Sequence, residues 1–186
     1  MKRFGIEFEA QNRKPKYGSK NYYSSMRVGI IDKGFSLGLE HEPQSIDGIV
    51  YYNACSRMTT MDMYKDFSLR FSIEPSRVYG AITSVYMTED SMSSDRVYIY
   101  KSTPYRLWGS NIKVGGSKVL ANLEFIDFSC KDGLCRVSSE GEVITEFMVE
   151  PKNRYIMFEM DAADHVTHLK PKSTSSLVKH IELKNT

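Results

Sequence analysis

The side chains best suited to ligand chemistry lie in one short segment, residues 95–100, which reads DRVYIY. Successive side chains of a β-strand point to opposite faces, so the alternation predicts that Arg96, Tyr98 and Tyr100 share one face. A guanidinium group donates several hydrogen bonds, and a tyrosine ring presents a flat apolar surface with a polar tip. Such side chains are typical of surfaces that face a sugar or another protein.

Three carboxylates, Glu89, Asp90 and Asp95, lie in or beside the loop that we expect before this strand. Acid/base catalysis by paired carboxyl groups requires a defined separation between them. A loop does not give its side chains the fixed spacing that a strand gives to residues i, i+2 and i+4. We therefore interpret the three acids as a solvated loop and not as a catalytic set.

Cys130 and Cys135 bracket an Asp-Gly pair, which is a favoured two-residue turn of a β-hairpin. That turn places the two cysteines opposite each other as a non-hydrogen-bonded pair, with Cα atoms about 4.5 Å apart. This separation is within the range of a disulfide, so we predict a Cys130–Cys135 bond, with two reduced thiols as the alternative. Cys55 is left over, as a small buried hydrophobic residue.

We predict no metal site and no cofactor. The three cysteines lack the spacing of zinc ligands, and no histidine lies near them in sequence. His165 and His168 lie in a predicted loop, where they do not share a face as they would on a helix. The sequence contains no G-x-S-x-G motif and no glycine-rich phosphate loop, and Gly115-Gly116 reads as a turn.

The 186 residues, 41% of them hydrophobic, favour one domain with a substantial core. A net charge of +2 is too balanced to indicate a nucleic-acid partner. No apolar run approaches the roughly 20 residues of a membrane span, and the first residues lack the apolar stretch of a signal peptide. The protein is either cytoplasmic, or secreted or cell-surface with its leader absent from this chain; the predicted disulfide favours the second setting.

Strand patterns recur along the chain, and no segment shows helical periodicity beyond a turn or two. The clearest pattern is Phe67–Ile73, whose alternate apolar residues should share a buried face. Other strands are expected at 4–9, 28–31, 35–39, 49–52, 80–87, 97–100, 122–128, 136–137, 143–149, 155–160 and 178–183. A flexible basic loop is predicted at 11–27 and a polar loop at 170–177. We therefore predict a single all-β domain over residues 1–186, built as two stacked antiparallel sheets.

The order of these segments over residues 35–170 resembles the family 16 glycoside hydrolases, which are β-glucanases and xyloglucan-modifying enzymes. Residues 56–72 resemble the segments before the family's catalytic strand, and residues 110–116 (SNIKVGG) resemble the segment after it. Residues 146–161 resemble a hairpin of the family. The resemblance implies a concanavalin A-like jelly roll, a cell-wall or surface setting, and a β-glucan-type polysaccharide as ligand.

The same resemblance implies a lost active site. In the family, the strand equivalent to 95–100 carries an E-x-D-x-E motif, whose alternate residues act as nucleophile, helper acid and acid/base. Arg96, Tyr98 and Tyr100 occupy those positions here and cannot replace two carboxyl groups about 5–5.5 Å apart. The implied protein is a catalytically inactive pseudoenzyme that binds a glycan in a relic cleft of Arg96, Tyr98, Tyr100 and Asn111. Two alternatives stay open: a structural or protein-interaction subunit with a plugged cleft, and residual hydrolase or transglycosylase activity.

Overall fold

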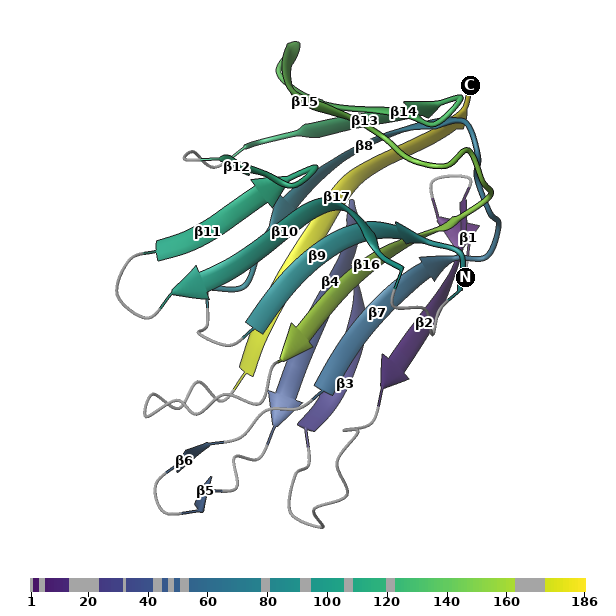
Figure 1. Ribbon diagram of the computed structural model, residues 1–186. Helices are drawn as coiled ribbons and strands as arrows, with labels where there is room; N and C mark the ends of the chain where they lie inside the picture. The colour runs from purple at the N-terminus through teal and green to yellow at the C-terminus, as the bar shows by residue number, and fades with distance from the viewer. Residues whose placement is uncertain are drawn as a thin grey trace.

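The computed structural model describes residues 2–3, 6–13, 24–31, 33–41, 45–46, 49–50, 54–77, 81–90, 95–105, 109–119, 123–162 and 173–186. All regular secondary structure in these ranges is β-strand (Figure 1). The strands are β1 (Lys2–Arg3), β2 (Ile6–Arg13), β3 (Ser24–Ile31), β4 (Gly34–His41), β5 (Ser45–Ile46), β6 (Ile49–Val50), β7 (Ala54–Thr60), β8 (Phe67–Glu74), β9 (Ala81–Thr88), β10 (Val97–Tyr105), β11 (Gly109–Val114), β12 (Ser117–Val119), β13 (Ile126–Lys131), β14 (Leu134–Ser139), β15 (Glu142–Met148), β16 (Tyr155–Ala162) and β17 (Ser173–Asn185). Across the described ranges, no helix has the length and apolarity to cross a membrane.

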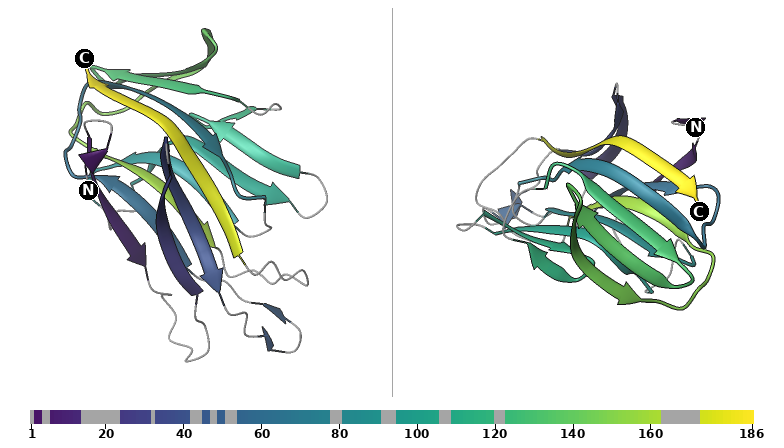
Figure 2. Two further views of the ribbon diagram at one scale, coloured as in Figure 1. Left: turned by 180° about the vertical axis from the view of Figure 1, so that it is seen from behind. Right: turned by 90° about the horizontal axis from the view of Figure 1, so that it is seen from above.

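Two antiparallel sheets contain almost all of these strands. The eight-stranded sheet has the order β1-β2-β7-β16-β9-β10-β11-β12, and the seven-stranded sheet has the order β15-β14-β13-β8-β17-β4-β3. Figure 1 shows β11, β10, β9, β16 and β7 side by side in the front layer, and the view from behind in Figure 2 brings the yellow β17 forward. Strands distant in sequence are neighbours in both sheets, as in a jelly roll. The predicted concanavalin A-like β-sandwich is confirmed.

The core lies between the sheets and is built from alternate residues of each strand. In β8, Phe67, Leu69, Phe71 and Ile73 are at most 8% exposed, which confirms their predicted shared face. From the opposite sheet, Phe158 of β16 meets the Phe71 ring edge-on, with ring centroids 5.9 Å apart. Burying a side chain of this size stabilises the fold by roughly 1.5–3 kcal/mol. These contacts fix which face of each strand points outward.

Two segments predicted as loops are partly strand. β2 continues to Arg13 and β3 begins at Ser24, within the loop predicted at 11–27. β17 begins at Ser173, within the loop predicted at 170–177. Each of these ends runs beside a partner strand, so ladder hydrogen bonds hold the backbone extended although the side chains are polar. Residues 14–23 and 163–172 lie outside the described ranges.

Residues 146–161, expected to resemble a hairpin, are divided between the two sheets. β15 pairs with β14 in the seven-stranded sheet, whereas β16 pairs with β7 and β9 in the eight-stranded sheet. The connection is anchored to a different layer at each end: Val149 N donates to Gly133 O at 2.9 Å, and Arg154 N donates to Tyr64 O at 2.9 Å. The expected hairpin is therefore wrong, because the segment crosses between layers instead of folding back on itself.

The cysteine hairpin forms as its Asp-Gly pair predicts. Asp132 and Gly133 have φ angles of 49° and 83°, the left-handed values that a type I′ turn requires. Cys130 lies directly opposite Cys135. Both are buried thiols, and Cys135 Sγ donates a hydrogen bond to Cys130 Sγ at 3.2 Å. The register is confirmed, whereas the bond between the sulfurs stays a prediction, and the side chain of Cys55 lies outside the described part of the chain.

Candidate functional site

The outer face of the eight-stranded sheet carries the residues that the sequence singles out. On β16, Phe158 packs into the core, so its neighbours Met157 and Glu159 point outward. Directly opposite Glu159 are Arg57 on β7 and Ser84 on β9. Residues paired across antiparallel strands lie on the same side of the sheet, so these side chains share the outer face.

Glu159 is the centre of a buried ion cluster on this face, with its side chain only 1% exposed. Its Oε2 accepts hydrogen bonds from Arg57 Nε and from the Tyr86 hydroxyl, each at 2.7 Å, and Arg57 Nη2 also contacts it. Its Oε1 accepts a hydrogen bond from Arg96 Nη1 at 2.7 Å. The Arg96 guanidinium in turn lies over the Tyr86 ring, 4.6 Å from the centroid, as a cation–π contact.

The cluster keeps Glu159 ionised. Burial alone would raise the pKa of this carboxyl group, but Arg57 and Arg96 outweigh burial and hold the pKa below its ordinary value. Burial, reinforced by the charge of Glu159, raises the pKa of the Tyr86 phenol, which stays protonated and donates. Burial opposes the charge of Arg96, yet Glu159 raises the pKa of this guanidinium. Glu159 is therefore a fixed acceptor and not a proton donor.

A β-bulge in β10 decides which tyrosine reaches the outer face. Tyr98 pairs with Tyr86, but Tyr100 pairs with Val85, so Ile99 is an extra residue between them. Tyr98 points outward, with its ring centroid 5.7 Å from that of Tyr86. Tyr100 is 2% exposed and belongs to the core between the sheets. The expectation that Tyr98 and Tyr100 share a face is wrong, because one extra residue inverts the alternation.

Lys101 takes the outward position that the sequence alternation assigned to Tyr100. It pairs with Ser84 of β9, in the same cross-strand row as Glu159. Its Nζ lies 4.9 Å from the centroid of the Tyr98 ring. The outer face of β10 therefore carries Lys101 beside Tyr98, and not a second tyrosine.

The remaining predicted site residues have separate positions. Arg96 reaches the outer face beside Tyr98, as expected, and is half-buried in the ion cluster. Asn111 lies opposite Thr103 in the ladder between β10 and β11, and its side chain is outside the described residues. The acids before the strand do not join the cluster: Asp90 and Asp95 are exposed, and Glu89 Oε1 lies 3.2 Å from Lys152 Nζ.

The outer face has two halves that differ in exposure. The filled half is the centre of the face, where β7, β16 and β9 are neighbours; it is formed by Arg57, Met157, Glu159, Ser84 and Tyr86, none of which is more than 5% exposed. In the open half, formed by β10, β11 and β12, the outward residues include Tyr98, Lys101, Lys113 and Lys118, which are partly or fully exposed. The face predicted as a relic cleft is therefore filled on one side and accessible on the other.

Sequence reasoning missed the ion cluster and Lys101. Glu159 and Arg57 are 102 positions apart, so no local motif joins them. One signal was present: β16 reads YIMFEMDA, in which Glu159 lies among apolar residues. A charge inside an apolar strand requires a partner, because an unpaired buried charge is strongly destabilising. That rule predicts a cation near Glu159 without identifying it.

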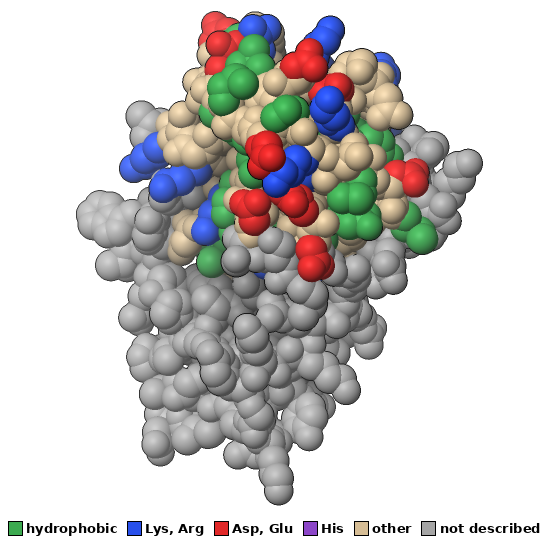
Figure 3. Space-filling model, turned by 45° about the vertical axis from the view of Figure 1, so that its right-hand side comes forward, with side chains coloured by type: hydrophobic (Ala, Val, Ile, Leu, Met, Phe, Trp, Pro, Cys, Tyr) green, Lys and Arg blue, Asp and Glu red, His purple; other side chains and the backbone are tan. Residues whose placement is uncertain are grey.

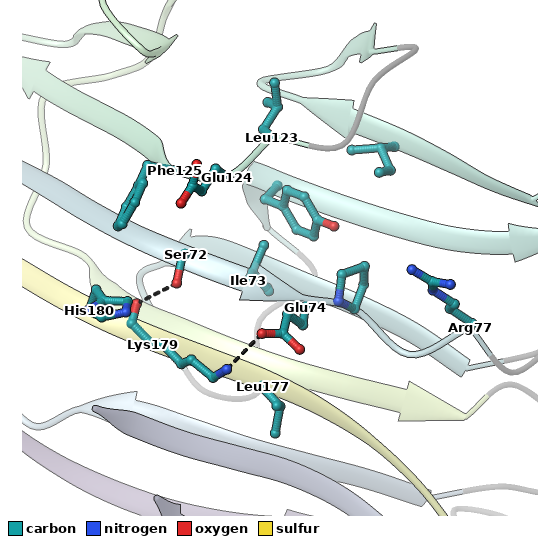
Figure 4. Close-up of a pocket in the computed structure, with 13 residues that line it drawn as sticks. Ser72, Ile73, Glu74, Arg77, Leu123, Glu124, Phe125, Leu177, Lys179 and His180 are labelled. Carbon is teal, nitrogen blue, oxygen red and sulfur yellow. Dashed lines mark hydrogen bonds and ion pairs between the residues drawn. The ribbon is translucent and has the colours of Figure 1, made fainter. Parts of the chain in front are cut away.

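A separate cavity of about 730 Å³ opens between the sheets, where β8 and β17 face β10 and β11. Ile73, Tyr100 and Ile112 contribute to its apolar lining. At its rim, Lys179 Nζ lies 2.7 Å from Glu74 Oε1, and Figure 4 shows this pair beside the cavity. Because Tyr100 lines this interior space, it does not contribute to a ligand surface on the outer face.

Comparisons with family models and with curated proteins find no match to this chain. Solved structures match its fold. A glycoside hydrolase family 16 endo-glucanase from Bacteroides ovatus gives a TM-score of 0.59 at 9% identity, covering 95% of this chain and 94% of that one. LamAcat from Zobellia galactanivorans gives 0.62 at 9% identity, covering 95% and 90%. The catalytic domain of a laminarinase (endo-1,3-beta-glucanase) from Thermotoga petrophila gives 0.56 at 9% identity, covering 97% and 99%.

The likeness extends over nearly the whole of both chains in each case, so it concerns the complete sandwich and not one sheet. At 9% identity it establishes the fold alone. The chain is a two-sheet jelly roll like that of the family 16 glycoside hydrolases.

Proposed function

We propose that this protein binds carbohydrate without hydrolysing it and uses the open half of the outer face to do so. The observation that carries the proposal is the state of Glu159, the one carboxylate among the described side chains of that face. Its oxygens accept hydrogen bonds from two arginines and a tyrosine, and it is 1% exposed. A carboxylate held in this way supports the sheet, and at 1% exposure its oxygens are not accessible to a substrate.

Retaining or inverting hydrolysis needs a carboxylate and a protonated carboxyl on either side of the glycosidic bond. Strands β9, β10, β11 and β12 contain no acidic residue. The other acid of the central strands, Asp161 on β16, has a side chain outside the described part of the structure. The low pKa of Glu159 makes it unsuitable as the protonated partner. These features support the absence of glycosidic-bond cleavage.

The open half offers the groups that hold a sugar. Tyr98 presents a partly exposed ring, with Lys101 Nζ 4.9 Å from its centroid. This ammonium group lies over the ring face, so a sugar stacked there would displace it, and the long lysine side chain could then donate hydrogen bonds to the sugar hydroxyls. The structurally similar proteins are an endo-glucanase and a laminarinase, which supports a β-glucan-type polysaccharide as ligand. Such a ligand favours a secreted or cell-surface setting over the cytoplasm.

The filled half supports a second candidate function, in which the jelly roll is a structural or protein-interaction subunit. Tyr86, Met157 and Glu159 occupy the centre of the outer face and are at most 1% exposed. If side chains block the cleft along its whole length, no sugar can bind in it. The two candidates differ in one respect: only the first requires an oligosaccharide to contact Tyr98.

The test is calorimetric titration of the purified chain with laminari-, cello- and mixed-linkage glucan oligosaccharides, followed by chromatography of the same samples. We expect binding without new reducing ends, and loss of binding in Tyr98→Ala. The control is Tyr155→Ala, which removes a partly buried tyrosine of β16, on the same outer face but away from the open half. Turnover by the wild-type chain that is lost in Asp161→Asn would contradict the proposal, and absence of binding to every oligosaccharide would favour the interaction subunit.

A further inference from the structure

Three lysines form a continuous row across the open half. Lys101 of β10 lies directly opposite Lys113 of β11, and Lys113 lies directly opposite Lys118 of β12. The residues beside Lys113 in sequence, Ile112 and Val114, are buried in the core, so Lys113 points outward. Adjacent strands are about 4.8 Å apart, so the row extends over roughly 10 Å. The three ammonium groups are thus presented to solvent on one side of the sheet.

This row is electrostatically unfavourable for the protein alone. Like charges directly opposite each other on neighbouring strands are destabilising. None of the three lysines forms an ion pair with any residue that the structure describes. Over the centre and top of the described surface in Figure 3, by contrast, acidic and basic side chains are interspersed. The three lysines therefore lack the neighbouring acidic side chains that balance basic ones elsewhere on the described surface.

The row is continuous with the proposed sugar site. Lys101 Nζ lies 4.9 Å from the centroid of the Tyr98 ring, so one lysine belongs to both features. Ser84 and Glu159 continue the same cross-strand row toward β7. A chain-like ligand that stacks on Tyr98 and extends across the strands toward β12 would pass over Lys113 and Lys118.

We propose that the polysaccharide bound by this face carries negative charges, as carboxylate or sulfate groups, and that Lys101, Lys113 and Lys118 pair with them. This inference rests on the carbohydrate-binding function proposed above. Charge complementarity supports it, because an anionic ligand turns three repelling cations into three ion pairs. Carboxylate and sulfate satisfy the same geometry, since both offer several acceptor oxygens to an ammonium donor.

A nucleic acid is the other polyanion that a basic row could bind. It fits the observations less well, because binding along a phosphate backbone requires a broad basic surface and the whole chain carries a net charge of only +2. The row instead provides a few cations beside one aromatic ring.

The experiment compares three ligands that share one backbone: a neutral β-glucan oligosaccharide, its carboxylated form and its sulfated form, with single-stranded DNA of similar charge as a fourth. The variant is the triple Lys101→Gln, Lys113→Gln, Lys118→Gln. Its matched control is Lys65→Gln, Lys131→Gln, Lys184→Gln, which removes the same charge from exposed lysines in or next to the seven-stranded sheet. Affinities are measured at low and high salt, and melting temperatures are recorded for both variants.

We expect wild type to bind at least one charged form roughly tenfold or more tightly than the neutral form at low salt, with the advantage lost at high salt. The row variant should lose that advantage, so that it binds the neutral and charged forms with similar affinity, and should melt at or above the wild-type temperature. The control variant should keep the advantage. Whichever charged form binds identifies carboxylate or sulfate.

Each of the other outcomes leads to a different conclusion. Equal affinity for neutral and charged forms, or an equal loss in both triple variants, overturns the lysine inference and leaves carbohydrate binding in place. No binding to any oligosaccharide overturns both. DNA that binds as tightly as the charged glucan, with the same dependence on the row, overturns the choice of polysaccharide.

Discussion

The two halves of the outer face handle charge in opposite ways. In the filled half, Arg57 and Arg96 converge on Glu159, and every charge has a buried partner. In the open half, Lys113 and Lys118 stand opposite each other with no ion pair among the described residues. Charges that form ion pairs inside the protein cannot also pair with a ligand. Charges without such a pair remain available to one. We infer that the filled half stabilises the sheet and that the open half recognises the partner.

The largest expected effect is on the filled half. Glu159→Ala leaves Arg57 buried without its carboxylate, and breaking a buried ion pair costs about 3–5 kcal/mol of unfolding free energy. Denaturant unfolding followed by fluorescence measures it. The control is Glu146→Ala, because the Arg136–Glu146 pair is exposed, with side chains 52% and 43% accessible, and should change stability by less than about 1 kcal/mol. Equal, small losses for both variants would show that the cluster does not support the sheet.

The two tyrosines on either side of the bulge provide the next contrast. Tyr100→Ala empties a site in the core and should lower the unfolding free energy by about 3–5 kcal/mol, as large aromatic truncations do. Tyr98→Ala removes a partly exposed ring and should alter stability far less while abolishing oligosaccharide binding. Thermal melting and calorimetric titration of both variants test this. A reversed pattern would place Tyr100 and not Tyr98 on the outer face.

Acidification should destabilise the filled half in a defined direction. The folded pKa of Glu159 is depressed, so its stabilisation is present above the unfolded pKa of about 4.3 and is lost as pH falls through the lower folded value. The gap in unfolding free energy between wild type and Glu159→Gln should therefore be largest near neutral pH and narrow in acid. Denaturant unfolding at a series of pH values measures it. A gap that widens on acidification would mean that the folded pKa is raised.

A smaller effect is expected from the cysteine hairpin. The Sγ atoms of Cys130 and Cys135 are 3.2 Å apart, so oxidised glutathione should convert both thiols to a disulfide with loss of one proton and one electron from each. The ring closed is short, so the gain should be near the low end of the range, about 2 kcal/mol. Alkylation and mass spectrometry should then label Cys55 alone. Three labelled cysteines after oxidation would show that the pair does not close.

Much of the sandwich follows from local sequence patterns, but the site does not. The period-two alternation of Phe67–Ile73 predicts a buried face, and the Asp-Gly pair predicts the register of Cys130 with Cys135, because both depend on neighbours in sequence. The bulge at Ile99 has no local signal, since an extra residue is defined only by the strand opposite. The cluster at Glu159 depends on partners far away in the chain.

A nuclear magnetic resonance titration of the labelled chain with the charged glucan oligosaccharide shows whether a ligand uses the open half and leaves the filled half untouched. We expect amide shifts to move along residues 97–103 and 112–119 and to stay fixed along residues 57–60 and 155–160. Lys101, Lys113 and Lys118 should show the steepest changes. Shifts confined to β7 and β16, or to the cavity between the sheets, would contradict the division of the face into a structural half and a recognition half.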